Sequence, residues 1–371
     1  MDSSSIVALM CKAGHRPKTF SIGFGQRSFN ELGYARQVAR MYGTDHHEEM
    51  VEPDAAQILP SLIWHLDEPF ADTSAVPTHA VAALAHRHLK VVLSGDGGDE
   101  MFAGYSWLRQ WKVADRLAAW PRSLRTALAK TVGGFGRGKS FLARVGRLAA
   151  DSLATPEEGF LRRVSCWTDP LKRQCYGPDL ARAGTDSHRE LLTILTDGRI
   201  PGFGSRMLYA DTKRYLPDDC LAKVDRMTMA HGLEARVPLV DHRVAEFAGR
   251  LPFEWKLHGL TTKHILKKAM ASDLPPVTTR QRKQGFAVPV DAWLRGPLGD
   301  QARRLILSPR ARARGLFNAA GLEALLAAHG EGREDLGQQI WTLLCLEVWC
   351  RLYLDGPPPG SAPQASLADL A

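Results

Sequence analysis

The chain has 371 residues, of which 44% are hydrophobic and 24% charged, with a formal net charge of +8. This is an ordinary globular composition, and the length is sufficient for a large core or for two subdomains. No apolar run approaches the roughly eighteen residues of a transmembrane helix, and Met1 to Ser5 lack the basic segment of a signal peptide. We therefore expect neither a membrane-spanning nor a secreted protein.

The six cysteines form no CxxC pair and no framework spacing, which is typical of scattered thiols in a reduced, cytoplasmic protein. Positive charge is concentrated between Trp107 and Ala150, where ten Lys and Arg accompany one acidic residue, Asp115. Nucleic-acid binding would explain such a run, but the segment contains no recognised nucleic-acid motif. We favour a solvated helical face or a docking surface for an acidic partner, and expect no nucleic acid and no membrane as partners.

The first hundred residues alternate between helical and strand patterns. The predicted elements are a helix at 3–12, a buried strand at 19–24, a helix at 31–42, a strand at 46–51, helices at 55–66 and 76–88, and a buried strand at 89–94. Gly43 is expected to end the second helix. This alternation predicts an α/β fold, with a parallel sheet and flanking helices.

Beyond Gly104 the strand signals fade, and helical patterns continue as far as Tyr353. We therefore divide the chain into an α/β core at 1–110, a mainly helical region at 111–354 and a disordered tail at 355–371, which begins near a Gly- and Pro-rich stretch. Open parallel sheets bind ligands beyond the carboxyl ends of their strands, and helices that follow the sheet can wall such a site.

The strongest motif is the turn Ser94-Gly95-Asp96-Gly97-Gly98-Asp99-Glu100, which opens directly out of the predicted strand at 89–94. Glycines let the backbone approach a ligand closely and point its amide groups at that ligand. The three acidic residues also suit Mg²⁺, which binds a few carboxylates together with phosphate oxygens. A tight acidic turn between a strand and a helix is the simpler interpretation, but its place at a strand's carboxyl end favours ligand binding.

A second motif, Met1-Asp2-Ser3-Ser4-Ser5, opens the first predicted helix. Taken alone it indicates a helix N-cap, and a helix N-terminus is also a natural site for phosphate. With Ser-Gly-Gly restored ahead of it, the motif would form the pyrophosphate loop of the adenylate-forming ATP pyrophosphatases.

These motifs identify a resemblance. From residue 1 to about Tyr353 the chain resembles the C-terminal synthetase domain of glutamine-hydrolysing asparagine synthetases, a domain of the ATP pyrophosphatase (PP-loop) type with an adenine nucleotide alpha hydrolase-like fold. One such motif would be weak, but the same set in the same order is hard to obtain by chance. The further markers are Phe20 to Phe24, Asp45 to Glu48, Asp67 to Asp72, Lys223 to Arg226, Gly232 to Asp241, Thr262 to Lys267 and Arg282 to Phe286.

The resemblance implies an ATP- and Mg²⁺-dependent ligase that forms asparagine from aspartate and ammonia. The side-chain carboxylate of aspartate would attack the α-phosphorus of ATP and release pyrophosphate. Ammonia would then attack the β-aspartyl-AMP intermediate, giving asparagine and AMP. The ammonia would come from a glutaminase domain or partner outside this chain.

The resemblance also assigns site residues. Asp2 and Asp99 match positions near Mg²⁺ and pyrophosphate, and Asp96 matches an acidic position near the intermediate, where many relatives carry Glu. Lys283 matches a lysine that contacts phosphate and stabilises charge in the transition state. The remaining positions expected to bind ATP or pyrophosphate are Ser3, Ser4, Ile22, Ser94, Gly95, Gly97 and Gly98.

In relatives a strand, the loop glycines and a glutaminase domain with an N-terminal cysteine precede the position of Met1. We therefore expect this sequence to be cut within its phosphate loop, through truncation or a start codon assigned too late, and to use free ammonia. Loss of the strand would leave an unpaired position in the sheet.

Several alternatives stay open, because the motifs recognise ATP and not the carboxylate. A β-lactam synthetase, a lasso-peptide cyclase or an amidotransferase acting on a polysaccharide would share them, as would a non-catalytic nucleotide-binding remnant. Glu234 and Arg236 fit a buried ion pair or a substrate pocket equally well, and Lys263 and His264 fit surface charge. The sequence is compatible with a homodimer and does not fix the oligomeric state.

Overall fold

The computed structural model of the protein describes residues 1–25, 31–52, 54–135, 141–183, 187–280, 286 and 288–370. Its first part alternates helices and strands as the sequence predicts, and Gly43 ends the second helix, α2, at a φ of 61°. The elements are α1 (Asp2–Lys12), β1 (Lys18–Gly23), α2 (Leu32–Tyr42), β2 (Asp45–Met50), α3 (Ala55–Leu66), α4 (Ala75–His86), β3 (Val91–Leu93) and α5 (Gly98–Phe102).

The strands form two separate parallel pairs. β1 pairs with β2, and β3 pairs with β4 (Glu234–Arg236), which comes from beyond the region where strands were expected. Both pairs lie against α4, because Phe20 of β1 and Val92 of β3 pack on its residues Ala82 and Ala85. The predicted parallel pairing is therefore confirmed, but the described strands do not join into one sheet.

The strand β3 differs from the prediction in its exposure. The sequence predicted a buried strand, yet Val91 and Leu93 are 40% and 39% exposed. Both side chains line a cleft, because among the described strands β3 pairs with β4 and is not hydrogen-bonded to β1.

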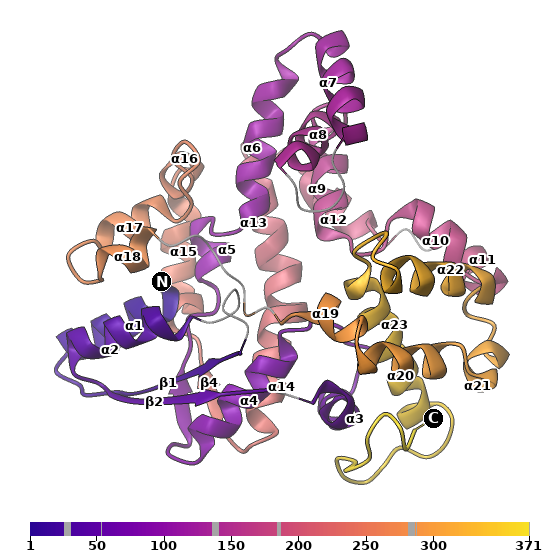
Figure 1. Ribbon diagram of the computed structural model, residues 1–371. Helices are drawn as coiled ribbons and strands as arrows, with labels where there is room; N and C mark the ends of the chain where they lie inside the picture. Colours follow the sequence, from indigo (N-terminus) through magenta and orange to yellow (C-terminus); the bar gives the residue numbers. More distant parts are fainter. Residues whose placement is uncertain are drawn as a thin grey trace.

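The chain is almost entirely helical after α5, as predicted. Figure 1 shows α6 (Ser106–Ala118) rising away from the strands toward α7 (Arg122–Phe135) and α8 (Phe141–Asp151), which belong to the basic segment. None of the described helices is long and apolar enough to cross a membrane.

The remaining helices wall the strands and build the second half of the molecule. They are α9 (Pro156–Val164), α10 (Asp169–Cys175), α11 (Pro178–Ala183), α12 (Arg189–Leu195), α13 (Phe203–Ala210), the π-helix η2 (Asp211–Leu221), α14 (Ala222–Met229), the 3₁₀-helix η3 (Pro238–Val240), α15 (His242–Arg250), α16 (Phe253–Lys256), α17 (His264–Ala269), α18 (Pro276–Arg280), α19 (Val290–Leu294), α20 (Pro297–Ile306), α21 (Pro309–Ala313), α22 (Ala319–Gly330) and α23 (Gly337–Tyr353). The π-helix contains Pro217, whose missing N–H interrupts the α-helical hydrogen-bond pattern.

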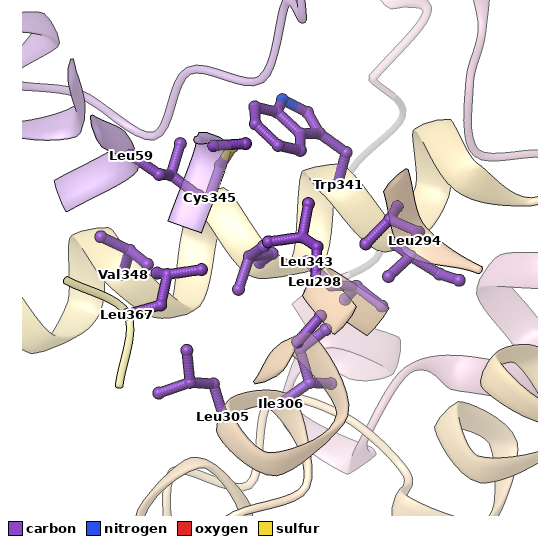
Figure 2. Close-up of a cluster of buried hydrophobic side chains, with 14 of the residues drawn as sticks. Leu59, Leu294, Leu298, Leu305, Ile306, Trp341, Leu343, Cys345, Val348 and Leu367 are labelled. Atoms are coloured by element: carbon purple, nitrogen blue, oxygen red, sulfur yellow. The ribbon is translucent and has the colours of Figure 1, made fainter. Parts of the chain in front are cut away.

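The largest hydrophobic core lies where α3, α20 and α23 meet. Trp341 and Val348 of α23 and Leu59 of α3 are at most 2% exposed, and Figure 2 shows them within one cluster with Leu305 of α20. Burying each such side chain stabilises the fold by about 1.5–3 kcal/mol.

The segment after α23 packs on this core, whereas the sequence predicted a disordered tail. Leu367 is fully buried in the cluster of Figure 2, and its backbone N–H donates to the carbonyl of Ala56 at 2.9 Å. The indole Nε1 of Trp64 donates to the carbonyl of Pro359, also at 2.9 Å. One apolar side chain and these hydrogen bonds thus fix a segment that its composition alone marks as disordered.

Candidate functional site

A single cleft with a volume of about 1110 Å³ collects most of the residues that the sequence predicts to be functional. It lies between the two strand pairs, beside the start of α1 and the glycine-rich turn, with α14 and α17 among its walls. The predicted residues that line it are Asp2, Ser3, Ser4, Ile22, Ser94, Gly95, Asp96, Gly97 and Asp99.

The glycine-rich turn fits closely around the start of α1. A Cβ atom on Gly95 would lie 2.9 Å from Cβ of Asp2, and one on Gly98 would lie 2.7 Å from Cγ of the same aspartate. Gly97 has a φ of 86°, which L side chains rarely adopt. Gly98 is buried behind the turn and does not line the cleft. The glycines therefore bring the turn and α1 together.

Asp2 and Asp99 meet at a buried lysine. The Nζ atom of Lys263 lies 2.7 Å from Oδ1 of Asp99 and also donates a hydrogen bond to Oδ2 of Asp2. Lys263 is only 5% exposed, so its prediction as surface charge is wrong. Burial opposes the charge, but the two carboxylates outweigh it and raise the pKa of Lys263. Gly104 leaves room for this contact, since a Cβ there would overlap Asp99 and Lys263.

The two aspartates also fit the predicted Mg²⁺. Oδ1 of Asp2 is buried and accepts no hydrogen bond from the described residues. Mg²⁺ is commonly held by one or two carboxylates, with phosphate oxygens and water as its other ligands. The described residues hold no group of three or more His, Cys, Asp or Glu side chains suited to a metal ion. The ammonium of Lys263 bridges the two aspartates, at the position that a metal cation would occupy.

The other predicted residues of the turn lie at the same edge. The hydroxyl of Ser94 donates a hydrogen bond to Oδ2 of Asp96, and both side chains are half-buried at the cleft. The backbone N–H of Ser94 donates to the carbonyl of Arg236 at 2.9 Å, which extends the pairing of β3 with β4. Ile22 is the penultimate residue of β1 and is 6% exposed, while Ser3 is exposed at the start of α1.

A second buried lysine lies elsewhere in the wall. Lys223 of α14 pairs with Asp72, and its Nζ atom lies 3.4 Å from Oδ1 of Asp219. Burial, reinforced by the charge of Asp72, raises the pKa of Asp219 to about 7. The sequence markers include Asp72 and Lys223 but did not predict their contact, because the two residues lie about 150 positions apart in the sequence.

The structure does not place three of the predicted residues in the cleft. Lys283 is not among the described residues, although Phe286, three positions later, lines the cleft. Glu234 and Arg236 form an ion pair at 2.7 Å, but their side chains are 54% and 63% exposed, so the pair is not buried. Only Ala235, which lies between them, reaches the cleft.

Comparison with known proteins gives the family of this chain. A sequence profile described as asparagine synthase matches residues 1–351. The chain belongs to the asparagine synthase family. It is 31% identical over 364 residues to asparagine synthetase [glutamine-hydrolyzing] 1 of Bacillus subtilis, covering 96% of this chain and 55% of that protein. It is 33% identical to a putative asparagine synthetase [glutamine-hydrolyzing] of Mycobacterium tuberculosis, covering 96% of this chain and 54% of the relative.

Some of the more distant relatives have other names. An amidase of Penicillium rubens is 25% identical over 332 residues, which cover 81% of this chain and 48% of the amidase. The chain spans about half the length of these curated relatives.

Proposed function

We propose that this chain is an ATP-dependent ligase that converts aspartate to asparagine through a β-aspartyl-AMP intermediate, releasing AMP and pyrophosphate. The observation that supports this most is the meeting of Asp2 and Ser3 of α1 with Gly95 and Asp99 at one edge of a cleft. A helix N-terminus and a glycine-rich turn both present backbone N–H groups, and such groups bind phosphate. The names of the relatives suggest the amino-acid substrate.

The nucleotide would lie along the carboxyl ends of β1 and β3. Ile22, Ser94 and Gly95 would contact the adenine side, where Ile22 offers an apolar surface. Ser3 and Ser4 would donate hydrogen bonds to the phosphates from the start of α1. The exposure of Ser3 leaves its hydroxyl accessible to such a ligand.

Asp2 and Asp99 would hold Mg²⁺, which would neutralise charge on the phosphates and help pyrophosphate to leave. Lys263 would then turn its ammonium from these carboxylates toward the phosphates, because a like charge would stand in its former place. Lys283 would contribute a further positive charge to the transition state.

The reaction would take two steps. First, a side-chain oxygen of aspartate bonds to the α-phosphorus as the bond from that phosphorus to the pyrophosphate oxygen breaks. Second, ammonia bonds to the acyl carbon, AMP leaves with the bridging oxygen, and the nitrogen loses one proton. Asp96 would lie near the intermediate and orient it, while the walls of the cleft limit hydrolysis by water.

The decisive experiment measures pyrophosphate release with Mg²⁺-ATP and ammonium, with and without aspartate, and detects asparagine as the product. Aspartate-dependent release that is lost in Asp99→Asn and kept in Asp115→Asn, an exposed aspartate of α6, supports the proposal. Release that aspartate does not stimulate contradicts it. Stimulation by a different carboxylate would instead indicate that this chain acts on another acyl substrate, as the relatives named amidases suggest.

A further inference from the structure

Positive side chains along the cleft differ in whether a carboxylate neutralises them. Lys223 and Lys263 are buried and each contacts two aspartates. Lys18 is exposed and pairs with Asp45 at the start of the strands. These three lysines therefore have counterions in the folded chain.

Lys267 differs from these three lysines. It lies one turn after Lys263 on α17, lines the cleft, and makes no ion pair with the described residues. Burial lowers the pKa of Lys267, and the like charges of Lys263 and Arg109 lower it further, whereas Asp2 opposes the shift. A cation that is partly desolvated and repelled by its neighbours gains most from a bound anion.

The position of Lys267 indicates which anion. Asp2 is close enough to act on its charge, and Asp2 lies at the phosphate end of the cleft. The cations that line the opposite part, Arg16 and Lys18, lie at or before the first residue of β1 and so are far from the carboxyl ends of the strands. A dense negative group beside Asp2 and α17 would satisfy Lys267.

We propose that Lys267 binds the terminal phosphates of the nucleotide and thereby makes the cleft prefer a triphosphate, or pyrophosphate, to AMP. This inference rests on the proposed function, because it takes ATP to be the ligand. Lys263 is paired with Asp2 and Asp99 until Mg²⁺ replaces it, whereas Lys267 pairs with no described carboxylate and can add its positive charge to the phosphates throughout. Once pyrophosphate has left, AMP has no group that reaches Lys267, which favours its release.

The test is equilibrium binding of ATP, AMP and inorganic pyrophosphate by titration calorimetry, at fixed Mg²⁺ and ionic strength. In Lys267→Met we expect ATP and pyrophosphate to bind about 10- to 100-fold more weakly, as for loss of one charge-assisted hydrogen bond, with AMP binding unchanged. Lys267→Arg should retain most of the affinity. Lys268→Met is the matched control, because it removes the same charge from an exposed neighbour on the same helix.

Two results would overturn the inference while leaving the proposed function intact. One is equal affinity of Lys267→Met and Lys268→Met for pyrophosphate; the other is equal weakening of AMP and ATP in Lys267→Met, which would indicate a general effect on the cleft. Failure of the wild-type protein to bind ATP, AMP or pyrophosphate would overturn both proposals. The titrations of the wild-type protein, which come first, reveal this outcome.

Discussion

Replacing Lys263 with methionine should leave Asp2 and Asp99 as adjacent carboxylates without their shared counterion. Their side chains are 18% and 9% exposed, so water replaces the lost ammonium poorly. Removing one partner of a buried ion pair costs about 3–5 kcal/mol. At about 2.1 cal/mol/K per residue, the unfolding entropy of 371 residues is about 0.8 kcal/mol/K, so the Tm should fall by about 4–6 °C.

Magnesium should reverse part of this loss, because it can take the place of the ammonium. At a concentration ten times its Kd, Mg²⁺ would return about 1.4 kcal/mol, or about 2 °C, to Lys263→Met. The wild-type protein should respond less, since its lysine competes for the same oxygens. Differential scanning calorimetry with MgCl₂, and with NaCl of equal ionic strength, measures both effects. An unchanged Tm in the variant, or an equal response to Mg²⁺ in both proteins, would refute this account of the site.

Two further predictions test other features of the chain. Lys256 is 6% exposed, and burial lowers its pKa from 10.5 to about 8. The buried charge therefore lowers the free energy of unfolding at and below pH 8, and this loss disappears as the pH rises toward 10.5. Lys256→Met should therefore stabilise the protein at pH 7 by up to about 3 kcal/mol, the opposite sign to Lys263→Met, and flatten the rise of Tm above pH 8; identical pH profiles would contradict this. Gly104→Ala should cost about 1–3 kcal/mol by forcing a Cβ against Asp99 and Lys263, and should lower aspartate-dependent pyrophosphate release. Gly33→Ala in α2, where a Cβ meets nothing within 4 Å, is the control that should leave release unchanged.

Local features of the sequence were sufficient where one short segment determines the structure. The glycines of the turn after β3 predicted a close approach of backbone to a ligand, and the structure brings that turn against Asp2. The end of α2 at Gly43 follows from a single residue that adopts positive φ. In both segments, the positions of the glycines were enough to predict the local structure.

Features that depend on distant contacts could not be predicted in this way. Lys263 follows a short loop and would be solvated in isolation, but it is buried because Asp2 and Asp99 arrive from elsewhere in the chain. The strand β4 has only three residues, too few for a recognisable alternation, and exists because β3 offers an edge. Leu367 likewise gives the last segment a fixed position that its Gly- and Pro-rich start conceals.

The separation of the strands into two pairs has a mechanical consequence. In the described part of the chain, β1 and β3 share no backbone hydrogen bonds, and each places a side chain on the small residues Ala82 and Ala85 of α4. One wall can therefore slide over the helix relative to the other without breaking a ladder, as in shear motions of packed elements. Backbone amides of the two pairs should accordingly exchange with solvent deuterium as separate cooperative units, and a ligand that touches both walls should slow exchange in both.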